Sequence, residues 1–387
     1  MVQPAYIAAT PEEVGVSSAK LEQLFARVRK DVDEGLQGSA AVAIARNGKI
    51  AGAAAFGKAV QGGVLRQAKP ETLYHLYSAT KGIMAISMWP LFEQGKLTPE
   101  QKVCEIIPEF GTNGKDVVTV EQLLLMTSGF PLAPHRPSEW ADRGRLIERF
   151  QQWRLTWEPD SKWEYHFTSS HWVETEIVER LTGKPYGQWL HETWSVPSGA
   201  ETLYIGLPRE LHEKTADVYF TNEPESVGEA TPESIYRFNY PEIRDAGNPG
   251  MGGIASAMDV ALYYAPLVNG GLSATGERLL KPETIADMTR VRTKAHHLNQ
   301  TTGGAGFPVN RGMGVVVAGD DGLSKERGFG SKTSPRAFGH AGAGGQLAWA
   351  DPETGISFGY VTNAHIPHRA IDIRTAELSD LAAVCAS

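Results

Sequence analysis

Residues 73–86 read LYHLYSATKGIMAI and contain the pattern Ser-x-x-Lys as Ser78-Ala79-Thr80-Lys81. On a helix this spacing places a hydroxyl and an ammonium group one turn apart on the same face, close enough for proton transfer. The flanking residues are apolar and aromatic, so a lysine here loses most of its water, which is costly unless its charge is paired or used. The stretch predicts a core helix that begins beside a reactive serine. The alternative is that Ser78 only caps this helix and Lys81 extends its amine toward water.

Two other serines lie in patterns that can mark a nucleophile. Ser17-Ser18-Ala19-Lys20 repeats the Ser-x-x-Lys spacing, but it stands at the start of the first predicted helix, where Ser18 is expected to be the N-cap. Gly355-Ile356-Ser357-Phe358-Gly359 matches Gly-x-Ser-x-Gly, a motif that requires a sharp turn from a strand into a helix. Here the motif follows a β-turn and continues as an apolar strand. Ser357 is therefore predicted to be an ordinary strand residue.

Three further segments follow Ser78 in a fixed order. Residues 120–131 read VEQLLLMTSGFP, residues 163–165 read Trp-Glu-Tyr, and residues 339–345 read GHAGAGG. Together with Ser78 and Lys81, these segments resemble the serine β-lactamase-like superfamily of class C type, with the class C β-lactamase and DD-peptidase fold. The sequence looks closest to the family VIII carboxylesterases and their acyltransferase relatives. The resemblance extends from residues 11–15 to the final predicted helix.

The resemblance implies a set of site residues. Ser78 and Lys81 match the family's Ser-x-x-Lys motif, Tyr165 matches its tyrosine, and His340-Ala341-Gly342 matches its Lys-Thr-Gly element. It also implies an oxyanion hole formed by the backbone N–H groups of Ser78 and Ala343. The glycines at 342, 344 and 345 suit this role, since backbone approaches a ligand closely only where side chains are absent. Lys332-Thr333-Ser334 also approximates Lys-Thr-Gly, but it lies in a polar stretch, so the element at His340 is preferred.

A serine that attacks a carbonyl needs a base, and the sequence offers Lys81 and Tyr165 as a pair. Lowering the pKa of a tyrosine from about 10 to about 7 requires roughly 4 kcal/mol. An ammonium about 4 Å away supplies a similar amount in a half-buried site, although burial of the phenol opposes it. The two groups are expected to titrate together. His340 is expected to line the cleft and to bond the substrate or the Tyr165 oxygen, or else to be a strand-end histidine satisfied by backbone.

One residue departs from the family pattern. The family's tyrosine is often followed by Asn in Tyr-x-Asn, where the asparagine binds a substrate amide, but this sequence has Phe167. The substitution favours esters, and we expect a serine carboxylesterase that works through an acyl-enzyme on Ser78. The alternatives are a β-lactamase or D-amino-acid peptidase or amidase, an acyltransferase or transesterase, and a sensor that is acylated once without turnover.

The sequence also predicts an α/β (α+β) fold with strands at both ends of the chain. Ala40-Val42-Ile44 leads into Asn47-Gly48, a strong signal for a hairpin with a type I′ turn. Strands are also expected at 312–317, 346–349 and 356–361, and a helix at 370–386. We therefore expect one antiparallel sheet region from residues 1–80 plus 301–387, flanked by helices. A mainly helical region at 81–300 would be inserted into it, with the active site in the cleft between them.

Composition excludes several other classes of protein. The 387 residues carry 37 basic and 45 acidic side chains, a net charge of −8, without the basic stripe that binds nucleic acid. No stretch reaches 18 consecutive apolar residues, and the start of the chain does not look like a secretion signal, so a soluble cytoplasmic protein is expected. No cofactor is expected, and no metal, because His296-His297 lacks acidic or sulfur companions in sequence. Neither the natural ester nor the oligomeric state follows from these observations.

Overall fold

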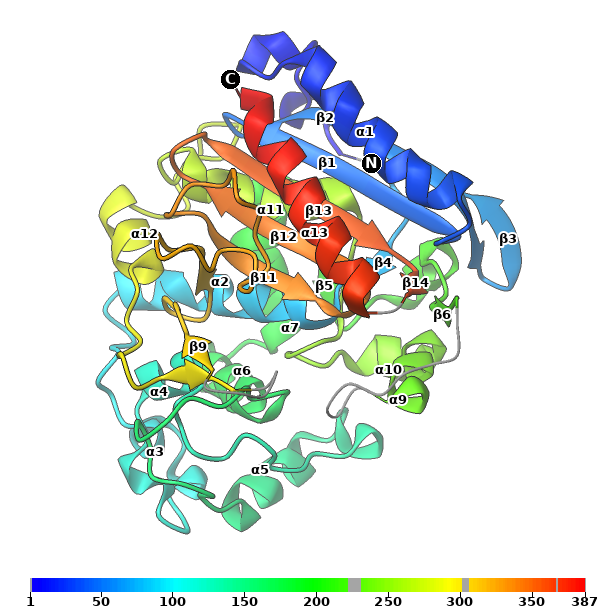
Figure 1. The fold of residues 1–387 in the computed structure, drawn as a ribbon. Coiled ribbons are helices and arrows are strands. Elements are labelled where there is room, and N and C mark those ends of the chain that lie inside the picture. Colours follow the sequence, from blue (N-terminus) through cyan, green and yellow to red (C-terminus); the bar gives the residue numbers. More distant parts are fainter. Residues whose placement is uncertain (1, 222–230, 301–305, 367, 387) are drawn as a thin grey trace.

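A seven-stranded antiparallel sheet forms the centre of the fold in the computed structural model, which describes residues 2–221, 231–300, 306–366 and 368–386 (Figure 1). Its order is β10-β11-β12-β13-β1-β2-β3. The two ends of the chain meet where β1 pairs with β13, with Val42 opposite Tyr360. The predicted fold class is confirmed, because N-terminal and C-terminal strands build one sheet. The strands of this sheet are β1 (Ser39–Arg46), β2 (Lys49–Gln61), β3 (Val64–Gln67), β10 (Val316–Val317), β11 (Phe338–Gly342), β12 (Gln346–Asp351) and β13 (Ile356–Thr362).

Short strands outside this sheet connect the loops that surround it. One group has the order β4-β7-β5, and two pairs join β14 to β6 and β8 to β9. Their bounds are β4 (Tyr74–His75), β5 (Tyr204–Ile205), β6 (Tyr219–Phe220), β7 (Gly253–Ala255), β8 (Leu298–Asn299), β9 (Phe307–Pro308) and β14 (Ala364–His365).

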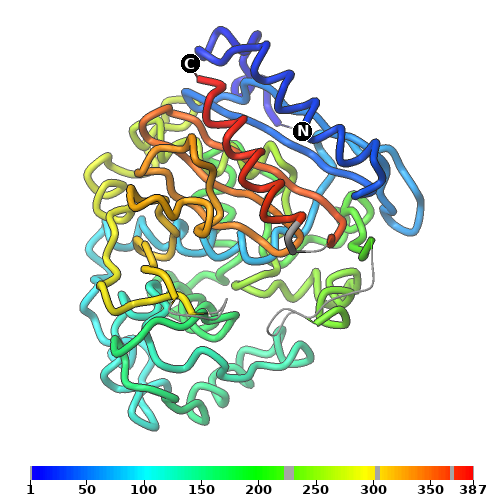
Figure 2. Tube along the Cα trace, viewed as in Figure 1, coloured from blue at the N-terminus to red at the C-terminus, as the bar shows by residue number. Residues whose placement is uncertain are grey.

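Helices cover both faces of the large sheet. The amphipathic helix α1 and the C-terminal helix α13 pack against each other and cover one face, and Figure 2 shows the two ends of the chain side by side there. Helix α11 covers the other face and contacts β1, β12 and β13. The helices are α1 (Ser18–Asp33), α2 (Thr80–Glu93), α3 (Val103–Ile106), α4 (Val120–Leu125), α5 (Arg143–Gln152), α6 (Ser169–Thr182), α7 (Tyr186–Leu190), α8 (Val196–Ser198), α9 (Pro232–Tyr236), α10 (Pro241–Ala246), α11 (Ala257–Val268), α12 (Pro282–Thr289) and α13 (His368–Ala383). Within the described ranges, no helix combines the length and apolar character needed to cross a membrane.

Helix α2 lies between the sheet and the helical part of the chain. Its residues from Thr80 to Leu91 are all buried, as the apolar sequence after Ser78 predicts. Indole N–H groups attach other segments to it: Trp189 donates to the carbonyl of Ser87, and Trp89 donates to the carbonyl of Met313. Because α2 is enclosed on all sides, the side chains of its first turn, Lys81 among them, are held in fixed positions.

Two local predictions need correction. The stretch 312–317 is a strand only at Val316–Val317, because Gly314 has φ +84° and a Cβ there would lie 2.1 Å from the Cβ of Ala85. The chain turns tightly against α2 instead of extending. The N-cap of α1 is Ser17, whose hydroxyl accepts from the Lys20 N–H, and not Ser18, whose N–H donates to Glu12. The predicted hairpin is confirmed, with φ +54° at Asn47 and +79° at Gly48.

The boundaries of the two predicted regions remain a prediction. The boundary at 80/81 falls at the start of α2, and residues 301–305 beside the boundary at 300/301 lie outside the described residues. Helix α11 belongs by sequence to the predicted helical region, yet it packs directly on the sheet. The helical part of the chain therefore also contributes one layer of the sheet region.

Gly359 on β13 offers a test of this packing. A Cβ at Gly359 would lie 2.4 Å from the backbone oxygen of Ala257, so Gly359→Ala must push α11 away from the sheet. We expect the free energy of unfolding to fall by about 1–3 kcal/mol in urea titrations. Gly52→Ala is the matched control on the same sheet, because its closest neighbour is the flexible end of Leu21. Equal losses for both variants would contradict this account.

Candidate active site

The chain reaches Ser78 through a strained residue. Tyr77 has φ +46°, a left-handed conformation that a bulky residue adopts only where its surroundings enforce it. Its buried ring packs edge-on against Phe238 and His365, at centroid distances of 5.4 Å and 5.0 Å. A single 3₁₀ turn, Tyr77–Ala79, then leads into α2. Ser78 is partly exposed between the buried residues Tyr77 and Ala79, so its hydroxyl is accessible on a rigid support.

Lys81 lies one turn further along and is almost completely buried. Its Nζ lies 3.3 Å from Ser78 Oγ and donates to the carbonyl oxygen of Gly250 at 2.8 Å. The side chain is 1% exposed. Burial, assisted by the charge of Arg311, lowers the pKa of Lys81 well below its usual value, whereas Glu174 opposes this shift. A neutral amine in this position can accept the proton of the Ser78 hydroxyl.

Tyr165 lies beside both Lys81 and Ser78. The Lys81 Nζ lies 4.9 Å from the centre of the Tyr165 ring. Burial raises the pKa of Tyr165 to about 12, although hydrogen bonding to Ser78 and the charge of Arg311 both lower it. The expectation that Lys81 would bring this pKa down toward 7 is therefore wrong. Burial is the largest effect on both groups, and it lowers the pKa of Lys81 but raises that of Tyr165. Of the two, Lys81 is suited to accept a proton and Tyr165 to donate one.

Strand β11 brings the predicted oxyanion residues to Ser78. A Cβ on Gly342 would lie 2.2 Å from the carbonyl oxygen of Leu76 and 3.2 Å from the nitrogen of Ala79, so the two backbones are in contact. Ala343 follows directly and is partly exposed. The structure thus brings the loop at Gly342 and Ala343 beside the turn that carries Ser78.

His340 has features of both sequence interpretations. Its Nδ1 bonds the carbonyl of Ala341 at 2.7 Å, as in a histidine satisfied by backbone. Its ring also lies 6.3 Å from the Tyr165 ring, and among the described residues its buried Nε2 has no hydrogen-bond partner. Burial lowers the pKa of His340 well below its usual value, so the ring is neutral. Because a carbonyl oxygen only accepts, the ring proton is on Nδ1, which donates it to the Ala341 carbonyl. The Nε2 atom is therefore a hydrogen-bond acceptor at the wall of the site.

Two charged residues near the site were missed by the sequence reasoning. Arg311 is 2% exposed and Glu174 is 1% exposed, and each interacts electrostatically with Lys81. Burial lowers the pKa of Arg311 to about 10 and raises that of Glu174 to about 8. The only signal in sequence was a charged residue inside an apolar pattern, such as Glu174 in HWVETEIV. Both groups set the electrostatic environment in which Lys81 and Tyr165 titrate.

The segment that carries Tyr165 is tied to residues 127–131. Ser128 Oγ and His166 Nε2 lie 3.0 Å apart, and His166 Nδ1 bonds the carbonyl of Glu164 at 2.7 Å. His166 is fully buried, and burial lowers its pKa to about 3, so it is a neutral link between the segments. This contact explains why the two motifs flank one site although they are distant in sequence.

The alternative serines are used structurally. Ser357 is buried in β13, and its hydroxyl donates to the carbonyl of Ala261 at 2.7 Å. Ser17 caps α1. The prediction that neither is a nucleophile agrees with these contacts.

The structure supplies an acidic companion to His296 and His297. Ligand atoms of these residues and of Asp160 lie within 4.8 Å of one another, so the premise that the histidines lack such a companion is wrong. The two Nε2 atoms lie 2.8 Å and 3.2 Å from the Asp160 carbonyl, and Lys294 pairs with its carboxylate. His297 Nδ1 accepts the N–H of Lys294, so its Nε2 carries the proton. We interpret this cluster as a set of hydrogen bonds and an ion pair that hold the loop at Asp160 against residues 294–297.

The comparisons with known proteins agree with this fold and site. A family model described as beta-lactamase matches residues 25–382, and the chain belongs to that family. A penicillin-binding protein homologue from Caulobacter crescentus superposes with a TM-score of 0.79 and 28% identity, covering 95% of this chain and 98% of that chain. The crystal structure of a family VIII carboxylesterase also has a TM-score of 0.79, at 25% identity, covering 94% and 98%. The esterase/beta-lactamase LipL of Mycobacterium tuberculosis is 26% identical over 320 residues, 74% of this chain and 68% of LipL. The protein is therefore a hydrolase of the serine β-lactamase fold.

A fluorophosphonate probe tests which serine is reactive. We expect it to label Ser78, and we expect Ser78→Ala to reduce labelling at least about 1000-fold because the accessible hydroxyl beside a neutral amine is lost. Peptide mapping by mass spectrometry locates the adduct. Ser357→Ala is the control, with unchanged labelling. An adduct on Ser357, or full labelling of Ser78→Ala, would contradict the assignment.

The pH dependence of this labelling tests the pKa shift of Lys81. At low pH the amine is protonated and cannot accept the serine proton, so the rate should rise with pH through the lowered pKa of Lys81. The rate should then stay level to about pH 10, because Tyr165, with a pKa of about 12, keeps its proton. Lys81→Arg should remove labelling at every pH, since a guanidinium does not lose its proton. A rate that still rises beyond pH 10.5, the ordinary value for lysine, would show that the shift is absent.

Proposed function

We propose that the protein is a serine carboxylesterase that forms an acyl-enzyme on Ser78. The observation that carries this proposal is Phe167, whose ring packs edge-on against Tyr165 at 5.2 Å. The position beside the proton donor therefore presents an aromatic surface and no amide group. A substrate amide therefore finds no hydrogen-bond partner at position 167. An ester without that amide needs no such partner, so Phe167 does not weaken its binding. An ester is accordingly the better match among acyl donors.

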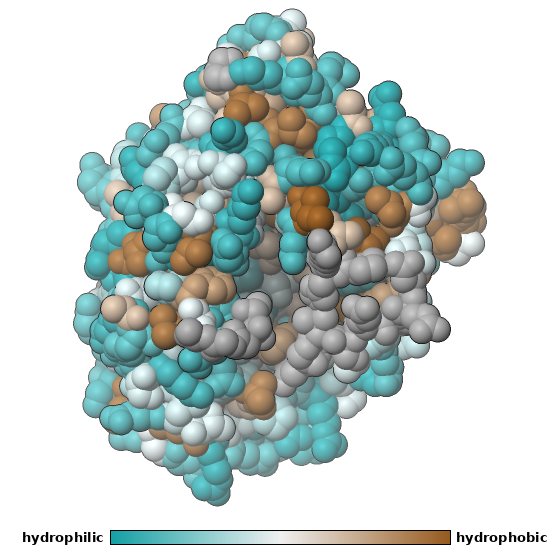
Figure 3. Space-filling model, in the orientation of Figure 1, coloured by the Kyte–Doolittle hydropathy of each residue, from teal (hydrophilic) through white to brown (hydrophobic). Residues whose placement is uncertain are grey.

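An apolar cluster beside the nucleophile supports an apolar acyl or alcohol group. The cluster has a buried core with partly exposed side chains packed against it. It includes Tyr77, the residue before Ser78, and Ala343 of the proposed oxyanion loop, so it lies next to both. Figure 3 shows that this face of the molecule is hollowed near its centre, between the sheet and the helical part. An apolar ester group gains free energy by leaving water for such a surface. The cluster consists of Tyr77, Val218, Ile235, Phe238 and Ile243, with Trp140, Phe220, Met251 and Ala343 packed against it.

In the first step, Ser78 Oγ attacks the ester carbonyl while Lys81 takes its proton. The negative charge that develops on the carbonyl oxygen is stabilised by the backbone N–H groups of Ser78 and Ala343. Collapse of this intermediate expels the alcohol, which receives a proton from Tyr165, and Lys81 returns a proton to Tyr165. The products of this step are one acyl-serine and one alcohol.

In the second step, water attacks the acyl-serine carbonyl with the same groups in the reverse roles. As the water attacks, it gives a proton to Tyr165 while Tyr165 passes its own proton to Lys81, and the protonated Lys81 then donates a proton to Ser78 Oγ, which leaves as a hydroxyl group. The released product is the carboxylic acid. An alcohol that takes the place of water would give a new ester instead, so acyl transfer needs no further group from the protein.

Rapid-mixing kinetics with a short-chain p-nitrophenyl ester test this proposal. We expect a burst of p-nitrophenol of one equivalent per active site, followed by steady turnover, with an acyl adduct on Ser78 in intact-mass spectra. Nitrocefin and a D-alanyl-D-alanine peptide are run in parallel and should acylate the enzyme at least about 100-fold more slowly. Fast nitrocefin or peptide turnover with little ester turnover would overturn the proposal. Labelling without any turnover would indicate a sensor.

Phe167→Asn is the matched variant for the substrate preference. It returns an amide to the position beside Tyr165, so the ratio of kcat/KM for nitrocefin to that for the ester should rise by about tenfold or more. Phe167→Leu keeps the position apolar and should leave the ratio unchanged. Equal ratios in both variants would show that Phe167 does not determine the preference.

A further inference from the structure

The loop that carries the proposed oxyanion donor is flexible by composition. It runs from Gly342 through Ala343 to Gly344 and Gly345, and the last two residues have φ +77° and +91°. Glycines populate many backbone conformations, so this loop is not fixed by its own residues. Pairing of Gly342 with Gln346 fixes its start and end, but the peptide units of Ala343 and Gly344 lie outside that ladder. An N–H that stabilises a developing charge must be aimed before the reaction begins.

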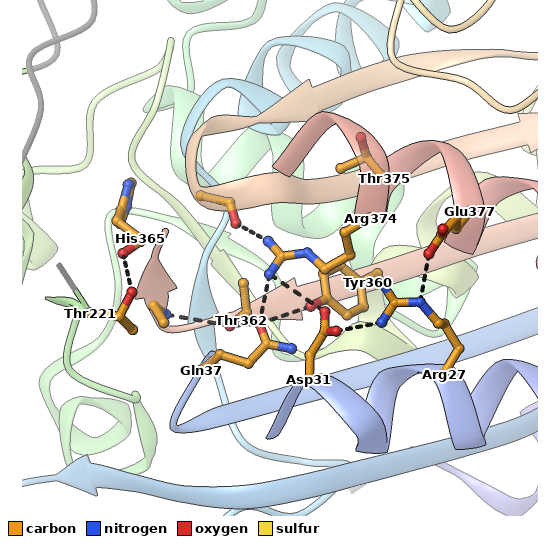
Figure 4. Close-up of polar contacts among 12 residues, drawn as sticks. Arg27, Asp31, Gln37, Thr221, Tyr360, Thr362, His365, Arg374, Thr375 and Glu377 are labelled. Carbon is orange, nitrogen blue, oxygen red and sulfur yellow. Dashed lines mark hydrogen bonds and ion pairs between the residues drawn. The ribbon is translucent and has the colours of Figure 1, made fainter. Parts of the chain in front are cut away.

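Arg374 on α13 bonds this loop and lies within a network of polar contacts (Figure 4). Its Nη2 donates to the carbonyl oxygen of Gly344 at 2.6 Å, and its Nη1 donates to Gln37 Oε1 at 3.0 Å. The side chain is 1% exposed, so substrate cannot reach the guanidinium. A Cβ at Gly345 would lie 2.4 Å from Nη2, so the absence of a side chain there is what admits the guanidinium. The planar guanidinium thus joins α13 to the loop by one hydrogen bond and joins it to Gln37 by another.

The position of Arg374 is itself fixed by several partners. Its guanidinium lies 5.5 Å from the centre of the Tyr360 ring, and its Nη1 is 4.0 Å from Asp31 Oδ2. Asp31 in turn pairs with Arg27 at 2.5 Å, and Arg27 pairs with Glu377 at 2.7 Å (Figure 4). A buried charge that lost these partners would be strongly destabilising. The network therefore ties α1, α13 and β13 to the same carbonyl oxygen.

We propose that Arg374 is a positioning residue for the oxyanion hole, which fixes the Gly344 carbonyl and thereby aims the Ala343 N–H at the substrate oxygen. The loop is held at Gly342 by β11 and at Gly344 by Arg374, so Ala343 between them has one orientation. The contact is made in the free enzyme and does not involve substrate. Its loss affects the transition state, where the oxygen is charged, more than the bound ester. This inference rests on the proposed acyl-enzyme function of Ser78.

The test compares Arg374→Met and Arg374→Lys with the unmodified protein. Active-site titration with a p-nitrophenyl ester gives the number of competent sites, and kcat is expressed per site. We expect kcat to fall about 10- to 100-fold in Arg374→Met with KM within about threefold, and to fall less in Arg374→Lys. The inhibition constant of an aryl trifluoromethyl ketone, which forms a tetrahedral adduct with the serine, should rise by the same factor as kcat/KM falls. A role in stability alone would lower Tm and the number of competent sites and leave the rate per site unchanged.

Arg27→Met is the matched control, because it removes a guanidinium from the same network without touching the loop. Its kcat per site should stay within twofold of the original. Unchanged kcat and inhibition constant per site in Arg374→Lys and Arg374→Met would overturn the proposal, and if Arg374→Met does not fold, Arg374→Lys alone decides it. Absence of an ester burst in the unmodified protein would overturn the esterase function instead, so the two failures are distinguishable.

Discussion

Removal of water from Lys81 is the constraint on which the site depends. A charged ammonium in this position would be costly, because within the described part of the chain Lys81 bonds Gly250 O and Ser78 Oγ and forms no ion pair with a carboxylate. Burial therefore lowers the pKa of Lys81 and so favours its neutral form, and the same burial raises the pKa of Tyr165 and keeps the proton on its phenol. One physical effect thus prepares a proton acceptor and a proton donor beside the serine. The enclosed helix α2 buries Lys81, whereas Ser78 beside it stays partly exposed to substrate and water.

The sequence predicted the parts of this arrangement that depend on local pattern. The hairpin at Asn47-Gly48 follows from the backbone requirements of a type I′ turn, and α13 follows from the apolar pattern at 370–386. Ser78, Lys81 and Tyr165 could be singled out because their spacing and order match a known family, and the structure brings them together. Arg311, Glu174 and Asp160 could not, because nothing in their local sequence shows which distant side chain they meet. The extent of β10 was wrong for a similar reason, since Gly314 turns the chain to avoid Ala85 on a different helix.

The excess of glycine has a partial explanation in these contacts. The 41 glycines form about 11% of the chain, against a background of about 7%. Gly342, Gly345 and Gly359 each lie where a Cβ would strike a backbone oxygen or a buried guanidinium at 2.4 Å or less. They permit close approach of β11 to the serine turn, of Arg374 to the proposed oxyanion loop, and of α11 to the sheet. In all three cases glycine provides space for a neighbour, and only Gly345 also needs a positive φ.

The pairing of β1 with β13 has a consequence for how the chain is made. Strand β1 emerges from the ribosome early, but its partner lies more than 300 residues later, so the central ladder of the sheet is among the last contacts to become available. Until then one edge of β1 has no neighbouring strand and presents unpaired N–H and C=O groups together with the apolar residues Val42 and Ile44. During this interval the nascent protein is exposed to aggregation through β1. The same topology makes contact between Ser78 and the proposed oxyanion loop depend on the synthesis of residues 338–351, because this loop joins β11 to β12.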